Sequence, residues 1–198
     1  MRVCKTYIIC VLLLLTAGLS VVAADIAPAA KKAKSTLVVS ERAKLEYKLE
    51  IYERASANRE LAALTQMEQA RDREQEAIAL QQTALAEGNE ERTISYKKAG
   101  KLFMDAARLC GFAADNFDQA SVSRHQVETL SIKLNNVQQQ RNASAFKLNL
   151  KQQASSAMQQ ASQACEKAAE AYDKAGDQGN LAAASQQAAV WLETLATR

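Results

Sequence analysis

The sequence contains one proline, Pro28, and no further proline interrupts the chain up to Arg198. Proline ends helices and is frequent in turns, so a long stretch without it favours long helices. The chain also holds 39 alanines and 18 glutamines among its 198 residues. Both residue types favour helices over strands. We therefore predict an all-α fold, and the sequence argues against sandwiches and barrels.

The N-terminus has the pattern of a secretory signal peptide, over residues 1–24. Two basic residues, Arg2 and Lys5, precede an apolar run, and small residues end the segment. This order predicts cleavage between Ala24 and Asp25, and therefore a secreted, periplasmic or otherwise extracytoplasmic protein. The alternative is an uncleaved membrane anchor, because the apolar run is nearly long enough to span a bilayer. After cleavage we expect no membrane contact.

Loss of this segment changes the charge and the cysteine content. Removing Arg2 and Lys5 lowers the formal net charge from +3 to +1, and removing Cys4 and Cys10 leaves two cysteines, Cys110 and Cys165. A nearly neutral chain with interspersed signs gives no electrostatic reason to expect a nucleic-acid partner. Residues 25–35 are predicted to be a flexible N-terminal segment, and residues 36–198 a single α-helical repeat domain.

An internal repeat occurs three times, in residues 50–56, 115–121 and 170–176. Each copy reads acid, any residue, aromatic, acid, long polar residue, alanine, then serine or glycine. The second and third copies also share apolar positions spaced three and four residues apart, as in one face of a helix. The repeat predicts that its aromatic residues fill equivalent packing positions between alanine-rich helices. These residues are Tyr52, Phe117 and Tyr172.

The serine or glycine that closes each copy predicts a turn, and Gly88 predicts another. The expected helices cover residues 36–55, 59–86, 90–119, 123–140, 145–175 and 180–196. Because no glycine or proline occurs between Phe112 and Ala175, one continuous helix through residues 141–145 is the alternative. We expect antiparallel helix pairs stacked as a short solenoid-like array, or a helical bundle in which the repeat is incidental.

Residues 96–109, which read YKKAGKLFMDAARL, resemble tetratricopeptide-type helix pairs, particularly those of soluble NSF attachment proteins. Residues 171–177, followed by 181–184, are similar to the turn between two such helices. The spacing of 55 to 65 residues between copies differs from the usual period of about 34. The resemblance implies stacked helix pairs and protein binding, without a specific partner.

Two cysteines, Cys110 and Cys165, occupy equivalent positions of the repeat. In an oxidising compartment they could form a disulfide. Alternatively they are two small apolar residues of the core. Equivalent residues of parallel stacked helices point the same way, which opposes the bridge.

Asn142 begins an Asn-Ala-Ser triplet, the acceptor for N-glycosylation, within the predicted break near residues 141–145.

His125 and Glu128 lie one helical turn apart, but they match no template for a metal or acid–base site, so we interpret them as a solvated surface pair. The sequence has no glycine-rich phosphate loop, nucleophile elbow or zinc spacing. We therefore predict no catalytic, cofactor-binding or metal-binding residue and no enzymatic activity.

The leading hypothesis is an exported, non-enzymatic helical-repeat protein that binds another, unidentified protein. A structural surface or coat-type helical bundle, similar to an adhesin, is the alternative. A lipid-binding amphipathic protein is disfavoured, because the apolar faces are rich in alanine and poor in bulky side chains. The sequence leaves the oligomeric state open.

Overall fold

The structure is a computed structural model that describes residues 29–197, with side chains described from Ser40 onward. Its four helices are α2 (Ala29–Ala84), α3 (Asn89–Lys133), α4 (Val137–Lys174) and α5 (Gln178–Ala196). The chain divides into two units after Ser40, and the four-helix arrangement is described for the second, from Glu41 onward. The predicted all-α fold is confirmed over the described residues. The predicted signal peptide and its cleavage site at Ala24 and Asp25 lie outside them.

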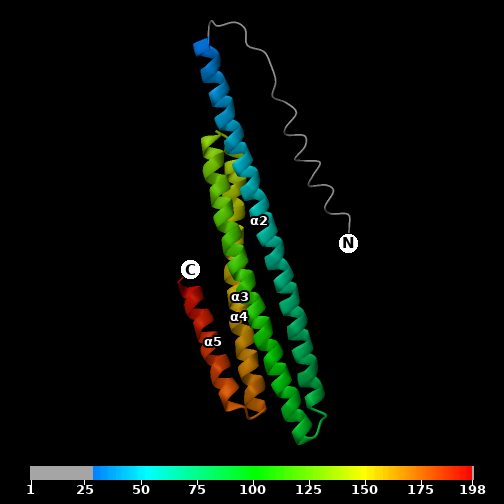
Figure 1. The fold of residues 1–198 in the computed structure, drawn as a ribbon. Helices are drawn as coiled ribbons and strands as arrows, with labels where there is room; N and C mark the ends of the chain where they lie inside the picture. The colour runs from blue at the N-terminus through cyan, green and yellow to red at the C-terminus, as the bar shows by residue number, and fades with distance from the viewer. Residues whose placement is uncertain (1–28, 198) are drawn as a thin grey trace, which may run out of the picture. The chain divides into compact units, whose positions relative to one another are not determined.

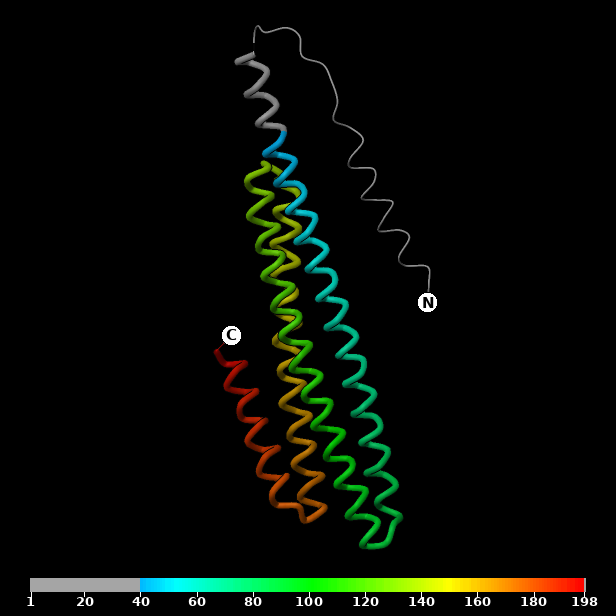
Figure 2. Tube along the Cα trace, in the orientation of Figure 1, coloured from blue at the N-terminus to red at the C-terminus, as the bar shows by residue number. Residues whose placement is uncertain are grey.

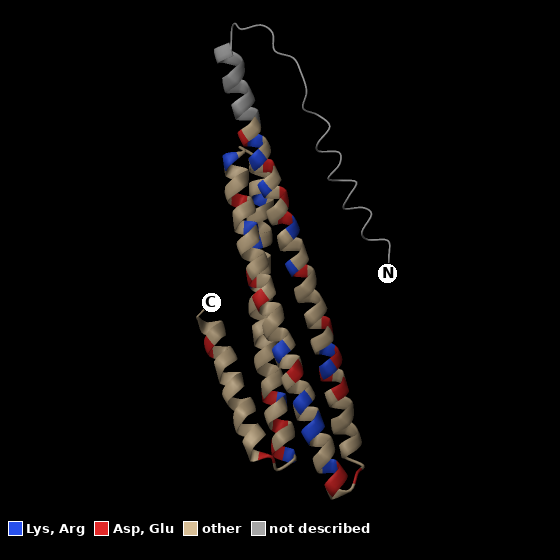
Figure 3. Cartoon of the chain, viewed as in Figure 1, with Lys and Arg blue, Asp and Glu red and all other residues tan. Residues whose placement is uncertain are grey.

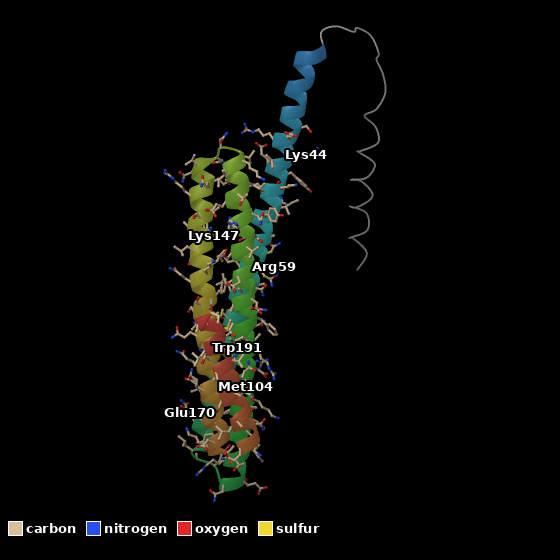
Figure 4. The ribbon with its side chains drawn as sticks, turned by 90° about the vertical axis from the view of Figure 1, so that its left-hand side faces the viewer. Lys44, Arg59, Met104, Lys147, Glu170 and Trp191 are labelled. Carbon is tan, nitrogen blue, oxygen red and sulfur yellow. The ribbon has the colours of Figure 1, made fainter. Side chains whose placement is uncertain are left out.

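From Glu41 onward, successive helices run antiparallel and are joined by short turns (Figures 1 and 2). α3 and α4 form a central pair, α2 covers one face of that pair, and the shorter α5 covers part of the opposite face (Figures 1 and 4). The two faces are therefore covered unequally, because α5 ends about halfway along α3 and α4.

The core follows a seven-residue period, as in a coiled coil. The buried residues at this spacing are Leu49, Ser56, Ala63, Ala70, Ala77 and Ala84 in α2, Ala99, Ala106, Ala113, Ala120 and Val127 in α3, and Ala143, Leu150, Ala157, Ala164 and Ala171 in α4. Most of these side chains are small, which permits neighbouring helix axes to approach closely. The alanine content thus serves helix packing as well as helix propensity.

Three predicted helix breaks are wrong. Ser56 and Ser121 do not begin turns, because both are buried within helices. The Ser56 hydroxyl donates to the Ala120 carbonyl at 3.2 Å, and the Ser121 hydroxyl donates to the Lys147 carbonyl at 3.5 Å. A serine that bonds a neighbouring helix is as compatible with close packing as alanine. Residues 141–145 also lie inside α4, which confirms the continuous alternative at that point.

The actual turn between α3 and α4 lies at residues 134–136. Asn135 has a positive φ of 55°, a conformation that asparagine tolerates better than most residues. The Asn136 side chain then accepts a hydrogen bond from the Gln139 backbone N–H at 3.1 Å and caps α4. The turns predicted near Gly88 and Gly176 are confirmed. Residues 29–35, predicted to be flexible, form the first turns of α2.

The last two copies of the repeat lie on α3 and α4, which are antiparallel neighbours within the bundle. Their aromatic residues therefore do not stack in successive layers. Phe117 packs near the middle with Leu150 and Met158, whereas Tyr172 packs with Phe103. Of the two predicted arrangements, these helices form the bundle.

Candidate functional site

The predicted packing residues all contribute to the core, but in separate places. Phe117 and Tyr172 are buried, and Tyr52 is half-buried against the cluster around Leu49 and Val127. The Tyr172 ring lies against Gly100, where a β-carbon would come within 2.7 Å of the ring. Tyr172 therefore requires glycine at residue 100. These aromatic residues serve packing and do not converge on a common site.

Cys110 and Cys165 are unbridged in the structure, and both are buried in one apolar cluster. Burial raises the pKa of each thiol to about 11. The two cysteines belong to antiparallel helices. Their side chains therefore need not point the same way, as those of equivalent residues on parallel helices would. The disulfide stays a prediction, and in the free form both thiols are protonated and weakly nucleophilic at neutral pH.

Trp191 fixes α5 against the same cluster. Its ring occupies the space above Gly111, where a β-carbon would come within 2.6 Å of the ring. The indole also lies close enough to Cys165 to favour its thiolate, although no well-aligned hydrogen bond joins the two. The Ser162 hydroxyl donates to the Ala188 carbonyl of α5 at 3.4 Å. Together these contacts set the register of α5 on α3 and α4.

Beyond the end of α5, the uncovered groove between α3 and α4 becomes polar. Lys147 lies there on α4 (Figure 4) and forms an ion pair with Glu128 of α3. The hydrogen bond from Lys147, with a smaller contribution from His125 at 3.3 Å, holds the pKa of Glu128 below its usual range. His125 and Glu128 thus do form a pair, but Lys147 shares the carboxylate.

Asn142 is exposed on α4, where the Gln138 side chain donates to its carbonyl oxygen at 3.2 Å. The expectation that it lies in a helix break is wrong. Its exposure nevertheless leaves the side-chain amide accessible, so N-glycosylation stays a prediction.

The outer face of α2 carries a row of exposed apolar side chains that the sequence reasoning missed. Its members are Tyr47 (66% exposed), Leu61 (66%), Leu64 (49%), Ile78 (41%) and Leu85 (71%). Tyr47 and Leu61 are 14 residues apart, and Leu64, Ile78 and Leu85 are separated by 14 and 7. Tyr47 and Leu61 form one row, and Leu64, Ile78 and Leu85 form a second. Leu64 follows Leu61 by three residues, which is the offset between the two rows of a coiled-coil seam. We call these five residues the α2 outer stripe.

Charged residues of both signs alternate over α2, α3 and α4, whereas α5 carries a single charged residue, Glu193 (Figure 3). Within the described part of the chain, no group of three histidine, cysteine or acidic residues could hold a metal ion. None of the described helices combines the length and the apolar character needed to cross a bilayer. Comparison of the chain with protein-family models, curated proteins and solved structures finds no match.

Proposed function

We propose that this protein acts outside the cytoplasm as a non-enzymatic helical scaffold that binds a helix of another protein along the α2 outer stripe. The stripe is the observation that carries the proposal. Isolated exposed apolar residues are common on protein surfaces, but a row in coiled-coil spacing is typical of helix–helix recognition. The resemblance to tetratricopeptide-type helix pairs, which also implies protein binding, remains a prediction.

The spacing of the stripe favours a helical partner over an extended one. Apolar residues separated by seven and offset by three lie along one line of a helix, so a second helix can pack along them. Glu50, Arg54, Glu68 and Arg71 occupy the same two rows, and Glu50 forms an ion pair with Arg54. Their mixed charges favour a partner helix that alternates apolar and oppositely charged residues. The inner face of α2 is already buried against α3 and α4 and is not available.

The test is affinity capture from the exporting cell with three forms of the protein. The first is the wild type, and the second carries Leu61→Lys and Leu64→Lys in the stripe. The third carries Ala62→Lys and Gln69→Lys, which add the same charge at exposed positions of α2 outside the stripe. A specific partner should bind the wild type and the control and be lost from the stripe variant. Once purified, that partner should bind the wild type and the control but not the stripe variant.

Equal capture by all three forms would contradict the proposal. The oligomeric state, measured by light scattering after size exclusion, distinguishes partner binding from the alternative of a coat-type surface protein. If the stripe variant is monomeric where the wild type and the control self-associate, the stripe joins identical copies, and the coat-type function replaces partner binding.

A further inference from the structure

Arg124 occupies a position of α3 that belongs to the core in the preceding turns. Counting back by seven residues gives Phe117, Cys110 and Phe103, all of them buried. The Arg124 side chain is only partly exposed, and its guanidinium lies 4.8 Å from the centroid of the Phe146 ring. Its Nε atom is buried and has no hydrogen-bond partner. Buried donors are nearly always paired, so an unpaired guanidinium N–H here needs an explanation.

A cavity of about 320 Å³ lies beside this guanidinium, between α2, α3 and α4. This volume is at the lower end of the range typical of small-molecule sites, about 300–1,000 Å³. Its lining includes Arg124, Glu53, Gln139, Asn142 and Phe146. Asn142 is exposed, so the cavity reaches the surface, where a ligand can enter.

Two opposite charges line this cavity without contacting each other. Glu53 accepts a hydrogen bond from the Gln139 side chain at 3.0 Å, and Arg124 is stacked on Phe146. The ion pairs within 4.0 Å among the described residues do not include one between Glu53 and Arg124. Oppositely charged groups in one partly buried cavity attract each other strongly. Their separation leaves room for a molecule that carries both complementary charges.

We propose that this cavity binds a free, polar α-amino acid. The ligand carboxylate accepts hydrogen bonds from Arg124, whose planar guanidinium suits a carboxylate. The ligand ammonium donates to Glu53. The carboxamides of Gln139 and Asn142 supply donors and acceptors for a polar side chain. This site lies between helices and is separate from the α2 outer stripe, so it does not depend on the protein-binding function.

The test is isothermal titration calorimetry of the protein with glutamine, glutamate, serine and the remaining amino acids at millimolar concentrations. For the amino acid that binds best, its N-acetyl derivative lacks the ammonium and its amide derivative lacks the carboxylate. Both derivatives should bind at least tenfold more weakly. Absence of heat for every amino acid overturns the proposal, as does equal binding of the two derivatives and the parent amino acid.

Variants of the cavity assign the two charges. Arg124→Gln and Glu53→Gln should each weaken binding by roughly 10- to 100-fold, since hydrogen bonds to charged groups contribute about 1.5–3 kcal/mol. Arg108→Gln and Glu50→Gln are the matched controls, because these residues lie exposed on the same two helices and pair with neighbours on their own helix. Binding should be unchanged in both controls. Unchanged binding in Arg124→Gln overturns the proposal.

Arg124→Leu separates a binding role from a structural one. Leucine replaces an unpaired buried donor with an apolar side chain of the kind found in the core. The variant should therefore melt at the same temperature or higher and should lose amino-acid binding, as expected where function is retained at a cost in stability. A lower melting temperature with unchanged binding would show that Arg124 is structural and would overturn the proposal.

Discussion

At the scale of single residues, the bundle depends on side chains that are absent or very small. Gly111 lies inside α3, where glycine ordinarily weakens a helix relative to alanine by about 1 kcal/mol. It is retained because the Trp191 ring of α5 occupies the space of the missing β-carbon. Close approach of two helices here outweighs helix propensity.

Gly111→Ala should therefore destabilise the protein by about 1 kcal/mol. Overpacking costs about 1–3 kcal/mol and is partly offset by the better helix propensity of alanine. Urea unfolding measures the loss, and the fluorescence of Trp191, the single tryptophan, should shift as its ring is displaced. Gly179→Ala is the control, because a β-carbon added there would lie 3.9 Å from the nearest neighbouring atom, at an ordinary contact distance. A Gly111→Ala variant more stable than wild type would contradict the packing argument.

The two buried thiols give a prediction with a defined pH dependence. Burial holds the pKa of Cys110 and Cys165 near 11 in the folded protein, whereas unfolded thiols ionise near about 8.5. Iodoacetamide at pH 8 should therefore label the folded protein far more slowly than the urea-unfolded protein. Between about pH 8.5 and 11 the folded state retains protons that the unfolded state loses, so stability should fall as the pH rises.

The same measurement decides the predicted disulfide. The count is made on the protein that begins at Asp25, which lacks Cys4 and Cys10. Two thiols in its unfolded, unreduced form confirm free cysteines, and a count of zero confirms the bridge between Cys110 and Cys165. In the bridged case the pH dependence above would be absent, because no thiol remains to ionise.

At the scale of the elements, helix ends are determined by local caps and turns. The Asn136 side chain caps α4, and Asp177 caps α5 in the same way through the Asn180 N–H at 3.3 Å. Asn136→Ala should cost about 1 kcal/mol, the usual effect of removing an N-cap, whereas Asn136→Ser should be nearly neutral. Urea unfolding of both variants measures the difference. Equal losses in the two variants would show that the cap does not stabilise α4.

The all-α fold and two of the turns can be predicted from the sequence, since composition and the glycines near residues 88 and 176 act locally. That Ser56 and Ser121 lie inside helices cannot be predicted in this way. A serine next to small residues can begin a turn or bond a neighbouring helix, and only the neighbour decides between them. The turn at Asn135 was missed for a related reason, because asparagine is a weaker turn signal than glycine.

The candidate sites were predictable to a similar degree. Cys110 and Cys165 were expected in equivalent helical positions, and they are buried together. The α2 outer stripe was missed because the apolar residues of α2 fall on both of its faces, which weakens a search for one apolar face. Arg124 was missed because a single arginine in a helix is ordinarily solvated, and its core position depends on the seven-residue packing of α3 against α4.

At the scale of the whole four-helix unit, the α3–α4 pair is protected on both faces only where α5 covers it. Trp191 and Leu195 pack against the central clusters that contain Phe117, Leu150 and Cys165. Beyond the end of α5, the Glu128–Lys147 ion pair joins α3 to α4. Amide hydrogen exchange in the wild type should therefore be slowest in the part that α5 covers, residues 100–117 of α3 and 154–172 of α4, since exchange requires local opening of packed structure.

Ending the chain after Asp177, which removes α5, should raise exchange rates in one part of the bundle only. Residues 100–117 of α3 and 154–172 of α4 lose their cover and should exchange faster. The groove near Glu128 and Lys147 lies beyond the end of α5 and should keep its rates, so it serves as the internal control. Faster exchange throughout the bundle would instead mean that α5 is required for the cooperative fold. The expected local effect would make α5 a cover for the apolar half of the groove, with the polar half stable by itself.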